Sequence, residues 1–209
     1  EPEVLNEMLA VCQQNNIITI ADEVMTGFGR TGKFFATDHL SNKPDIFCLS
    51  KGLTGGTMAM GVTSCTQQLF DAFQGGDNSR SLFHGHSYTA NPIACSAALA
   101  SLEIFEQNNV FADITRITEQ HKKFVLKIGT NKKVKQARSK GTILALELNT
   151  AEGTSYFNTI RLKAYNYFIS KGILMRPLGN IIYVMPPYCI STNDLNYIYD
   201  SIQEFLKTL

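Results

Sequence analysis

The chain is 209 residues long, 44% hydrophobic and 18% charged, which is ordinary for a globular protein and argues against intrinsic disorder. Its 19 basic and 18 acidic residues leave a formal net charge of +1, so neither nucleic acid nor an anionic membrane surface is expected as a partner. No run approaches the roughly 18 consecutive apolar residues of a membrane span, and no signal peptide opens the sequence, which predicts a cytoplasmic protein.

The first segments of the chain indicate a helix followed by a buried strand. Residues 3–14 carry apolar side chains at helical spacing. Residues 17–21 form a continuous apolar, β-branched run, which is typical of a strand buried on both faces, and the run ends at the acidic pair Asp22 and Glu23. Because the helical pattern is already under way at the first residues, without an initiator methionine, we expect a fragment of a longer protein.

Two further short strands follow, separated by glycine-rich segments. A glycine-rich loop covers residues 26–32, and residues 46–49 form a second buried run that ends two residues before Lys51. A third strand is expected near residues 60–65. In open α/β sheets, ligands bind beyond the carboxyl ends of the strands. Asp22 and Lys51 are therefore expected to face a common crevice.

The remaining segments alternate between helices and strands. Helices are expected over residues 67–73 and 93–105, with a polar loop between them. Beyond residue 108 the pattern is that of a small α+β unit. Its expected helices cover residues 110–128, 156–171 and 193–207, and its expected strands lie near residues 136–137, 143–148, 173–176 and 181–185. We therefore place a domain boundary between residues 108 and 109.

The chemistry of Lys51 and Asp22 suits a cofactor that carries a carbonyl group and a pyridine ring. A lysine at a strand end binds anions or forms a covalent bond with a carbonyl carbon. A carboxylate opposite it can keep a pyridine nitrogen protonated, which lets the ring accept electrons. Each residue also has an ordinary interpretation, since acidic pairs often end strands and Ser-Lys-Gly often forms a turn.

Six segments together carry a resemblance to a known family. They lie at residues 22–32, 44–46, 50–56, 83–92, 175–180 and 183–187. Their combined pattern resembles the signature of pyridoxal-phosphate-dependent aminotransferases of class III, and it extends over essentially the whole chain. The resemblance implies an α/β fold, with residues 1–108 as the C-terminal part of the large cofactor-binding domain of a fold type I enzyme. Residues 109–209 would be the small α+β C-terminal domain.

Within this resemblance, two residues match the catalytic pair of the family. Lys51 matches the lysine that holds pyridoxal phosphate covalently and moves a proton during the reaction, because an amine can be both nucleophile and base. Asp22 matches the carboxylate that pairs with the protonated pyridine nitrogen. Both residues are therefore expected to bind the cofactor and to take part in catalysis.

Other residues match binding positions of the family. The resemblance assigns Gly85, His86 and Ser87 to a loop that reaches the cofactor phosphate of the partner subunit, which implies a homodimer. Ser87 stands where many relatives have threonine, and its hydroxyl can still donate a hydrogen bond. Arg176 matches the arginine that binds the substrate carboxylate through its planar fork, and Arg30 and Gly85 are expected to shape the substrate site.

The substrate implied by the resemblance belongs to biotin biosynthesis. Within the family, residues 54–58 and 176–187 are most similar to enzymes that transfer an amino group to 8-amino-7-oxononanoate, giving 7,8-diaminononanoate. The amino donor is adenosylmethionine or lysine. Two alternatives stay open, namely another class-III enzyme, such as an ω-amino acid aminotransferase, and a non-catalytic dimerisation module. The fragment itself is expected to be inactive, because residues that complete the cofactor pocket in relatives lie N-terminal to it.

Three other features have weaker functional interpretations. His84 and His86 lack a third and fourth ligand, so no metal site is expected. The glycine-rich loop lacks the Walker and Rossmann patterns over residues 27–32, so nucleotide binding is not expected. The five cysteines are widely spaced without a Cys-x-x-Cys pair, which favours reduced, mostly buried thiols of an intracellular protein.

Overall fold

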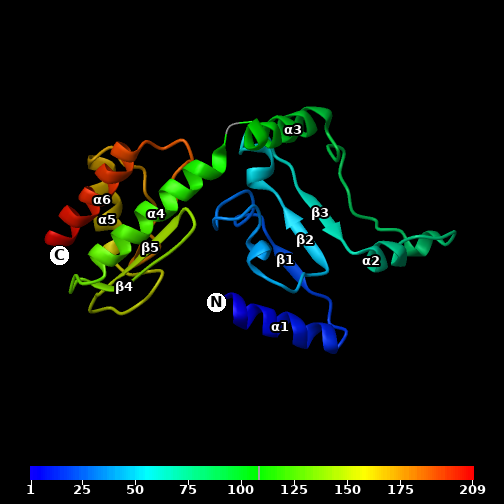
Figure 1. The fold of residues 1–209 in the computed structure, drawn as a ribbon, viewed down its shortest axis with the longest axis horizontal. Coiled ribbons are helices and arrows are strands. Elements are labelled where there is room, and N and C mark those ends of the chain that lie inside the picture. Colours follow the sequence, from blue (N-terminus) through cyan, green and yellow to red (C-terminus); the bar gives the residue numbers. More distant parts are fainter. Residues whose placement is uncertain (108) are drawn as a thin grey trace. The chain divides into compact units, whose positions relative to one another are not determined.

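The computed structural model describes residues 1–107 and 109–209. Their contacts divide the chain into two compact units, Glu1–Val110 and Phe111–Leu209. Each unit has its own three-stranded sheet (Figure 1). Each also has its own hydrophobic cluster. The boundary predicted from the sequence involves Asn108, which lies outside the described residues.

The N-terminal unit is built on a mixed sheet of strand order β1-β2-β3. The first strand, β1 (Ile20–Asp22), runs parallel to β2 (Ile46–Leu49), and Asp22 pairs with Cys48. The third strand, β3 (Val62–Cys65), is antiparallel to β2. Because β1 and β2 are parallel, the residues that follow their carboxyl ends leave the sheet at the same edge.

The strand predicted over residues 17–21 begins later and is not buried. Ile17, Ile18 and Ile20 are 54%, 56% and 64% exposed, and β1 starts at Ile20. The preceding helix, α1 (Pro2–Gln14), also contains no buried residue. A continuous apolar run selects extended backbone locally, but its burial requires layers packed on both faces. The described part of the chain does not cover these side chains, so the prediction of burial was wrong for this chain.

Two helices and three short 3-10 helices complete this unit. The helices are α2 (Gln67–Ala72) and α3 (Pro92–Gln107), and the 3-10 helices are η1 (Ala36–His39), η2 (Lys51–Thr54) and η3 (Asn78–Arg80). The side chain of Asn91 accepts hydrogen bonds from the first amides of α3, at 2.9 and 3.3 Å. Small side chains then let α3 pack closely on η2, where Ser101 Oγ donates to the carbonyl of Gly52 at 3.3 Å.

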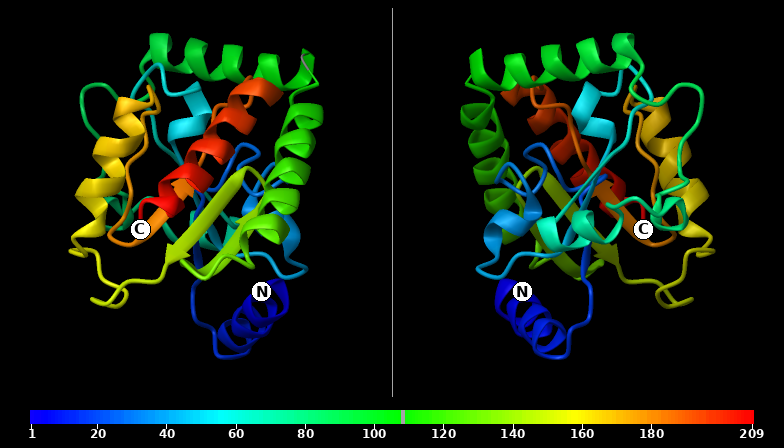
Figure 2. Two further views of the ribbon diagram at one scale, coloured as in Figure 1. Left: turned by 90° about the vertical axis from the view of Figure 1, so that its left-hand side faces the viewer. Right: turned by 90° about the vertical axis from the view of Figure 1, so that its right-hand side faces the viewer.

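The C-terminal unit is an antiparallel sheet covered on one face by helices. Its strands are β4 (Val134–Lys140), β5 (Ile143–Leu148) and β6 (Ile181–Val184), in the order β4-β5-β6. Its helices are α4 (Val110–Ile128), α5 (Ile160–Ser170) and α6 (Thr192–Lys207). The left view of Figure 2 shows α6 between α4 and α5. Alternate side chains of β5 and β6 are buried beneath these helices, as expected for a sheet with one covered face.

Two sequence predictions are corrected in the finer details. The strand predicted near residues 173–176 does not form, although Ile173 and Met175 are buried and Leu174 is exposed. This alternation resembles a strand, yet no ladder pairs the segment, and only Leu178 bridges to Ile181. The five cysteines are free, but none is buried, which contradicts the expected mostly buried thiols.

None of the helices in the described ranges combines the length and apolarity that crossing a membrane requires.

A buried histidine connects three elements of the C-terminal unit. His121 of α4 is fully buried, and its Nε2–H donates to the carbonyl of Thr142 at 3.1 Å. Because a carbonyl only accepts, Nδ1 must be the unprotonated nitrogen, and it accepts from the hydroxyl of Tyr199 at 2.6 Å. Burial lowers the pKa of His121 to about 4, so the neutral ring is part of the folded structure at neutral pH.

We expect this histidine to make the stability of the unit depend on pH. The pKa is near 6.5 when the chain is unfolded and about 4 when it is folded, so the unfolded state binds the extra proton first as the pH falls. The free energy of unfolding should decrease by about 3 kcal/mol between pH 6.5 and pH 4 from this group alone. Denaturant titrations of the protein and of His121→Gln at both pH values measure this decrease in the free energy of unfolding.

Glutamine is the matched comparison, because its amide can donate to Thr142 and accept from Tyr199 without gaining a proton. Acidic side chains titrate in the same range in both proteins. The contribution of His121 is therefore the difference between the two proteins in how steeply the free energy of unfolding changes with pH. Equal losses of stability in both proteins would contradict the assignment.

Candidate active site

Lys51 lies where β2 ends, in an unusual backbone conformation. It is the first residue of η2, and its φ of +41° is in the left-handed region that residues with a side chain rarely adopt. Such a conformation costs on the order of 1–3 kcal/mol and persists only when its surroundings enforce it. The side chain is exposed, and its amine forms no hydrogen bond or ion pair with any described residue. The lysine is therefore free to react.

Contacts on both sides of the turn hold this conformation. Ser50 Oγ donates to the carbonyl of Met60 at 2.6 Å, and Thr54, which is buried, donates to the carbonyl of Met58 at 2.7 Å. Gly52 lies directly against Phe28, since a Cβ atom on this glycine would be 2.8 Å from Phe28 Cδ2. The position therefore needs glycine because of close packing.

Asp22 is the last residue of β1, next to the strand that leads to Lys51. Its carboxylate is exposed, and Oδ1 accepts a hydrogen bond from the amide of Val24 at 3.0 Å. Since Asp22 pairs with Cys48 in the parallel ladder, the structure brings the aspartate and the lysine to the same edge of the sheet. The strands that lead to the two residues therefore end at one edge, as expected from the sequence, whereas the common crevice stays a prediction.

Glu23, the neighbour of Asp22, is a site residue whose role sequence reasoning missed. It is only 1% exposed, and its carboxylate accepts from the amides of Ala36 and Thr37 at 3.0 and 2.8 Å. It also accepts from the hydroxyl of Thr26 at 2.5 Å. Adjacent side chains on extended backbone point to opposite sides, so an acidic pair at a strand end already implied that one member points inward.

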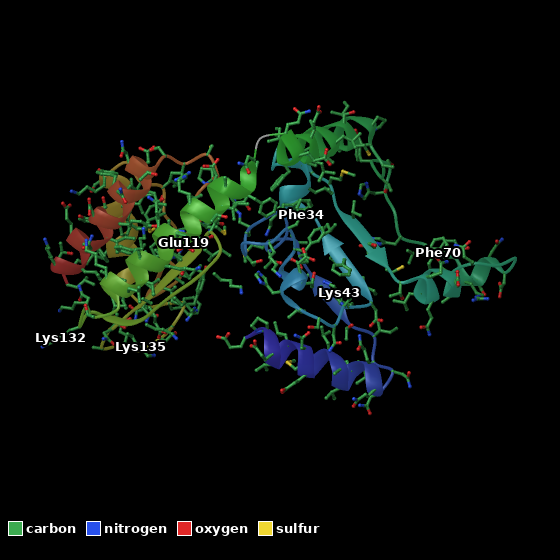
Figure 3. All side chains as sticks on the ribbon, viewed as in Figure 1. Phe34, Lys43, Phe70, Glu119, Lys132 and Lys135 are labelled. Carbon is green, nitrogen blue, oxygen red and sulfur yellow. The ribbon has the colours of Figure 1, made fainter. Side chains whose placement is uncertain are left out.

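The glycine-rich loop after Glu23 packs against the lysine turn. Phe28 is buried, with a φ of +59°, and its ring contacts those of Phe34 and Phe35 edge to face, with centroids 5.5 and 5.9 Å apart. Phe34, labelled in Figure 3, in turn contacts the ring of Phe105 in α3, with centroids 5.5 Å apart. Arg30 is half-buried in this loop. The loop and the residues after it thus pack against both α3 and the turn that carries Lys51.

The loop that contains Gly85, His86 and Ser87 is exposed along its whole length. The amide of His86 donates to Thr89 Oγ1 at 3.0 Å, and the amide of Tyr88 donates to His86 Nδ1 at 3.1 Å. Among the described residues, no hydrogen bond or ring contact joins this loop to the lysine turn. No group of three or more His, Cys, Asp or Glu side chains in the described ranges is arranged to hold a metal ion.

Arg176 belongs to the C-terminal unit, where it lines a groove of about 530 Å³. It is exposed, and its guanidinium pairs with no described residue, whereas Arg161 on the same groove lies over the ring of Tyr156 at 5.5 Å. Gly179 supports the groove, because a Cβ atom there would be 1.8 Å from the carbonyl oxygen of Ser155. The other lining residues are mostly aliphatic or aromatic: Leu162, Tyr165, Leu174, Pro177, Leu178 and Tyr183.

The groups at the sheet edge fit pyridoxal phosphate in two respects. The cofactor needs an amine that can bond to its aldehyde carbon, and the amine of Lys51 has no competing partner among the described residues. It also needs an anionic partner for its ring nitrogen, and the carboxylate of Asp22 is held by a single backbone donor that leaves its second oxygen available.

Comparison with known proteins gives one family over nearly the whole chain. The profile of the family described as "Aminotransferase class-III" matches residues 1–206. The chain is 40% identical over 208 residues to the adenosylmethionine-8-amino-7-oxononanoate aminotransferase of Synechococcus elongatus, covering 100% of this chain and 48% of that protein. It is also 40% identical over 205 residues to the protein of the same name from Methanocaldococcus jannaschii, covering 94% of this chain and 44% of that protein.

Solved structures give the same result for the fold. The crystal structure of the Methanocaldococcus jannaschii protein matches with a TM-score of 0.89 and 37% sequence identity, covering 98% of this chain and 49% of that chain. The mixed α/β architecture is therefore that of this family. The chain spans about half the length of the relatives that it matches.

Proposed function

We propose a function from the premise that this chain belongs to the class-III aminotransferase family. The protein that contains it transfers an amino group, with pyridoxal 5'-phosphate as cofactor, to 8-amino-7-oxononanoate, giving 7,8-diaminononanoate. Residues 1–108 are the C-terminal part of the large cofactor-binding domain, and residues 109–209 are the small C-terminal domain. The observation that carries the proposal is the amine of Lys51, which pairs with no described residue, in a left-handed turn beside the strand that ends at Asp22.

The roles of the two residues follow from their chemistry. When bound, pyridoxal phosphate supplies an aldehyde carbon that accepts the amino group and a protonated ring that accepts electrons. Lys51 would hold the cofactor through its Nζ, and its amine, when free, would carry the proton of the substrate Cα. Asp22 keeps the proton on the ring nitrogen.

Substrate recognition is assigned to residues on both units. Arg176 binds the carboxylate of the substrate, because its guanidinium is exposed without a partner among the described residues and its planar fork matches two carboxylate oxygens. The aliphatic and aromatic walls of its groove suit the long hydrocarbon chain of 8-amino-7-oxononanoate. Arg30 and Gly85 shape the site from their loops.

We also propose that the protein works as a homodimer. The loop around Gly85, His86 and Ser87 would contact the cofactor phosphate of the partner subunit. Support comes from Phe83 and Tyr88 on either side, which are 84% and 76% exposed. Large aromatic side chains in solvent often mark interaction surfaces.

Replacing Arg176 by lysine tests the substrate assignment. In the full-length protein, we expect Arg176→Lys to raise the KM for 8-amino-7-oxononanoate by about 10- to 100-fold, because a charged hydrogen-bond pair contributes about 1.5–3 kcal/mol. Its effect on kcat should be small, since the carboxylate is bound equally before and during the reaction. Steady-state kinetics with varied keto substrate measure both constants.

Arg161→Lys is the matched control, because Arg161 lines the same groove but lies over Tyr156. It should leave KM within about twofold. Equal increases of KM in both variants would contradict a specific role for Arg176.

The substrate itself is tested by expressing the full-length protein in a strain that requires 7,8-diaminononanoate. Failure to restore growth, together with turnover of ω-amino acids, would favour the ω-amino acid aminotransferase instead.

A further inference from the structure

Glu23 is a buried carboxylate that the proposed chemistry does not use. It is 1% exposed, and no described Lys, Arg or His forms an ion pair with it. Burying a charge is costly unless polar groups replace its hydration. Two amides and one hydroxyl do so here, from Ala36, Thr37 and Thr26. A buried carboxylate whose acceptors are satisfied in this way fixes the geometry of the groups that donate to it.

The donors come from the start of the glycine-rich loop and from the residues a few positions after its end. Thr26 lies at its start, and Ala36 and Thr37 lie where η1 begins, so one carboxylate closes residues 24–37 into a ring. The main chain of Glu23 is itself fixed, because its amide donates to the carbonyl of Cys48 in β2 at 3.0 Å. The loop is therefore anchored to the same two strands that end at the site.

The closed loop reaches Lys51 through Phe28. Phe28 is buried in the loop and packs so tightly on Gly52 that even one added carbon would lie 2.8 Å from its ring. Gly52 follows Lys51 directly, and the backbone of Lys51 is in the left-handed region. A shift of Phe28 would therefore release the contact that keeps the lysine turn in place.

We propose that Glu23 is a positioning residue, whose ionised carboxylate closes the loop and so makes Phe28 hold the Lys51 turn. This inference rests on the role of Lys51 in the proposed function. The charge is needed because the three donors use both carboxylate oxygens. In Glu23→Gln, one oxygen becomes an amide group that faces donors and cannot accept from them.

The experiment uses the full-length protein with bound pyridoxal phosphate. In Glu23→Gln, we expect the midpoint of the pH titration of the visible cofactor band, which follows the proton on the lysine nitrogen, to shift by on the order of half a pH unit or more. The Kd for pyridoxal phosphate should rise about tenfold, and kcat should fall about tenfold with little change in KM. Thermal unfolding measures the loss of stability separately.

Asp45→Asn is the matched control in the same sheet. Asp45 lies at the opposite ends of β1 and β2, where Oδ2 accepts from the amide and the hydroxyl of Thr19, both at 2.8 Å. This variant should lower thermal stability without moving the titration midpoint. If Glu23→Gln behaves in the same way, with stability reduced but midpoint and kcat unchanged, the positioning role is overturned.

A second variant and a cofactor-free measurement complete the test. Thr26→Val removes one of the three donors, so it should shift the titration midpoint in the same direction as Glu23→Gln but by less. If the midpoint of Thr26→Val does not shift at all, the proposal is overturned. This result decides the question even if Glu23→Gln does not fold. In the apoprotein, the pH profile of acetylation of the Lys51 amine should shift in Glu23→Gln as well. If the unsubstituted protein shows no cofactor band, the proposed function fails. In that case the pH profile of acetylation of the Lys51 amine alone decides the role of Glu23.

Discussion

Lys51→Ala in the full-length protein is expected to abolish the visible absorbance of covalently held pyridoxal phosphate and to lower turnover by about 10⁴-fold or more. The reason is that one side chain has two roles, as the covalent anchor of the cofactor and as the base that moves the substrate proton. Its amine has no hydrogen bond or ion pair with any described residue, so its loss should not disrupt the fold. Absorbance spectra and single-turnover rates measure the two effects.

Lys43→Ala is the matched control for this prediction. Lys43, labelled in Figure 3, is an exposed lysine of the same unit. Its Nζ lies 3.6 Å from Asp38 Oδ1 and donates to the carbonyl of Thr37 at 3.0 Å. Exposed ion pairs of this kind contribute little to stability, so spectrum and turnover should stay near those of the unsubstituted protein. A Lys51→Ala protein that retains the band, or turnover within tenfold, would show that another lysine holds the cofactor.

The second large effect is expected from Asp22→Asn, which should keep the cofactor bound but lower turnover by about a hundredfold, or about 2.7 kcal/mol of transition-state stabilisation. An amide carries no charge, so it cannot hold the proton on the ring nitrogen, and the neutral ring is a weaker electron acceptor. Asparagine can still accept from the amide of Val24, which is 3.0 Å from Asp22 Oδ1, so the local backbone should be preserved. Single-turnover kinetics at saturating cofactor measure the rate.

Asp113→Asn makes the same change of charge on α4, where Asp113 pairs with Arg116 at 2.9 Å. Its turnover should be unaffected, because Asp113 belongs to neither the cofactor nor the substrate positions, and a half-buried ion pair on one helix contributes little to stability. If Asp22→Asn keeps near-normal turnover, the role of Asp22 at the ring nitrogen is wrong. If Asp22→Asn loses the bound cofactor, Asp22 contributes to cofactor binding instead of to the rate of the bound enzyme.

The sequence by itself was sufficient for features that depend on near neighbours. The apolar run before Lys51 predicted β2 (Ile46–Leu49), and helical spacing predicted α4 (Val110–Ile128). Apolar runs that end in Asp22 and Lys51 also predicted a shared sheet edge, because parallel strands present their carboxyl ends together. The resemblance that led to the family depended on local motifs of the same kind.

Only the tertiary structure decided which polar groups are buried and what surrounds them. The sequence presents Asp22 and Glu23 as equivalent, yet one is exposed and the other is enclosed by donors up to 14 positions away. The left-handed conformation of Lys51 depends on its surroundings, and the adjacent Gly52 lies against Phe28, a residue from a distant loop. The segment near residues 173–176 alternates like a strand but finds no partner to pair with. In each case the outcome depends on contacts between residues far apart in the chain, and local composition does not encode which of those contacts form.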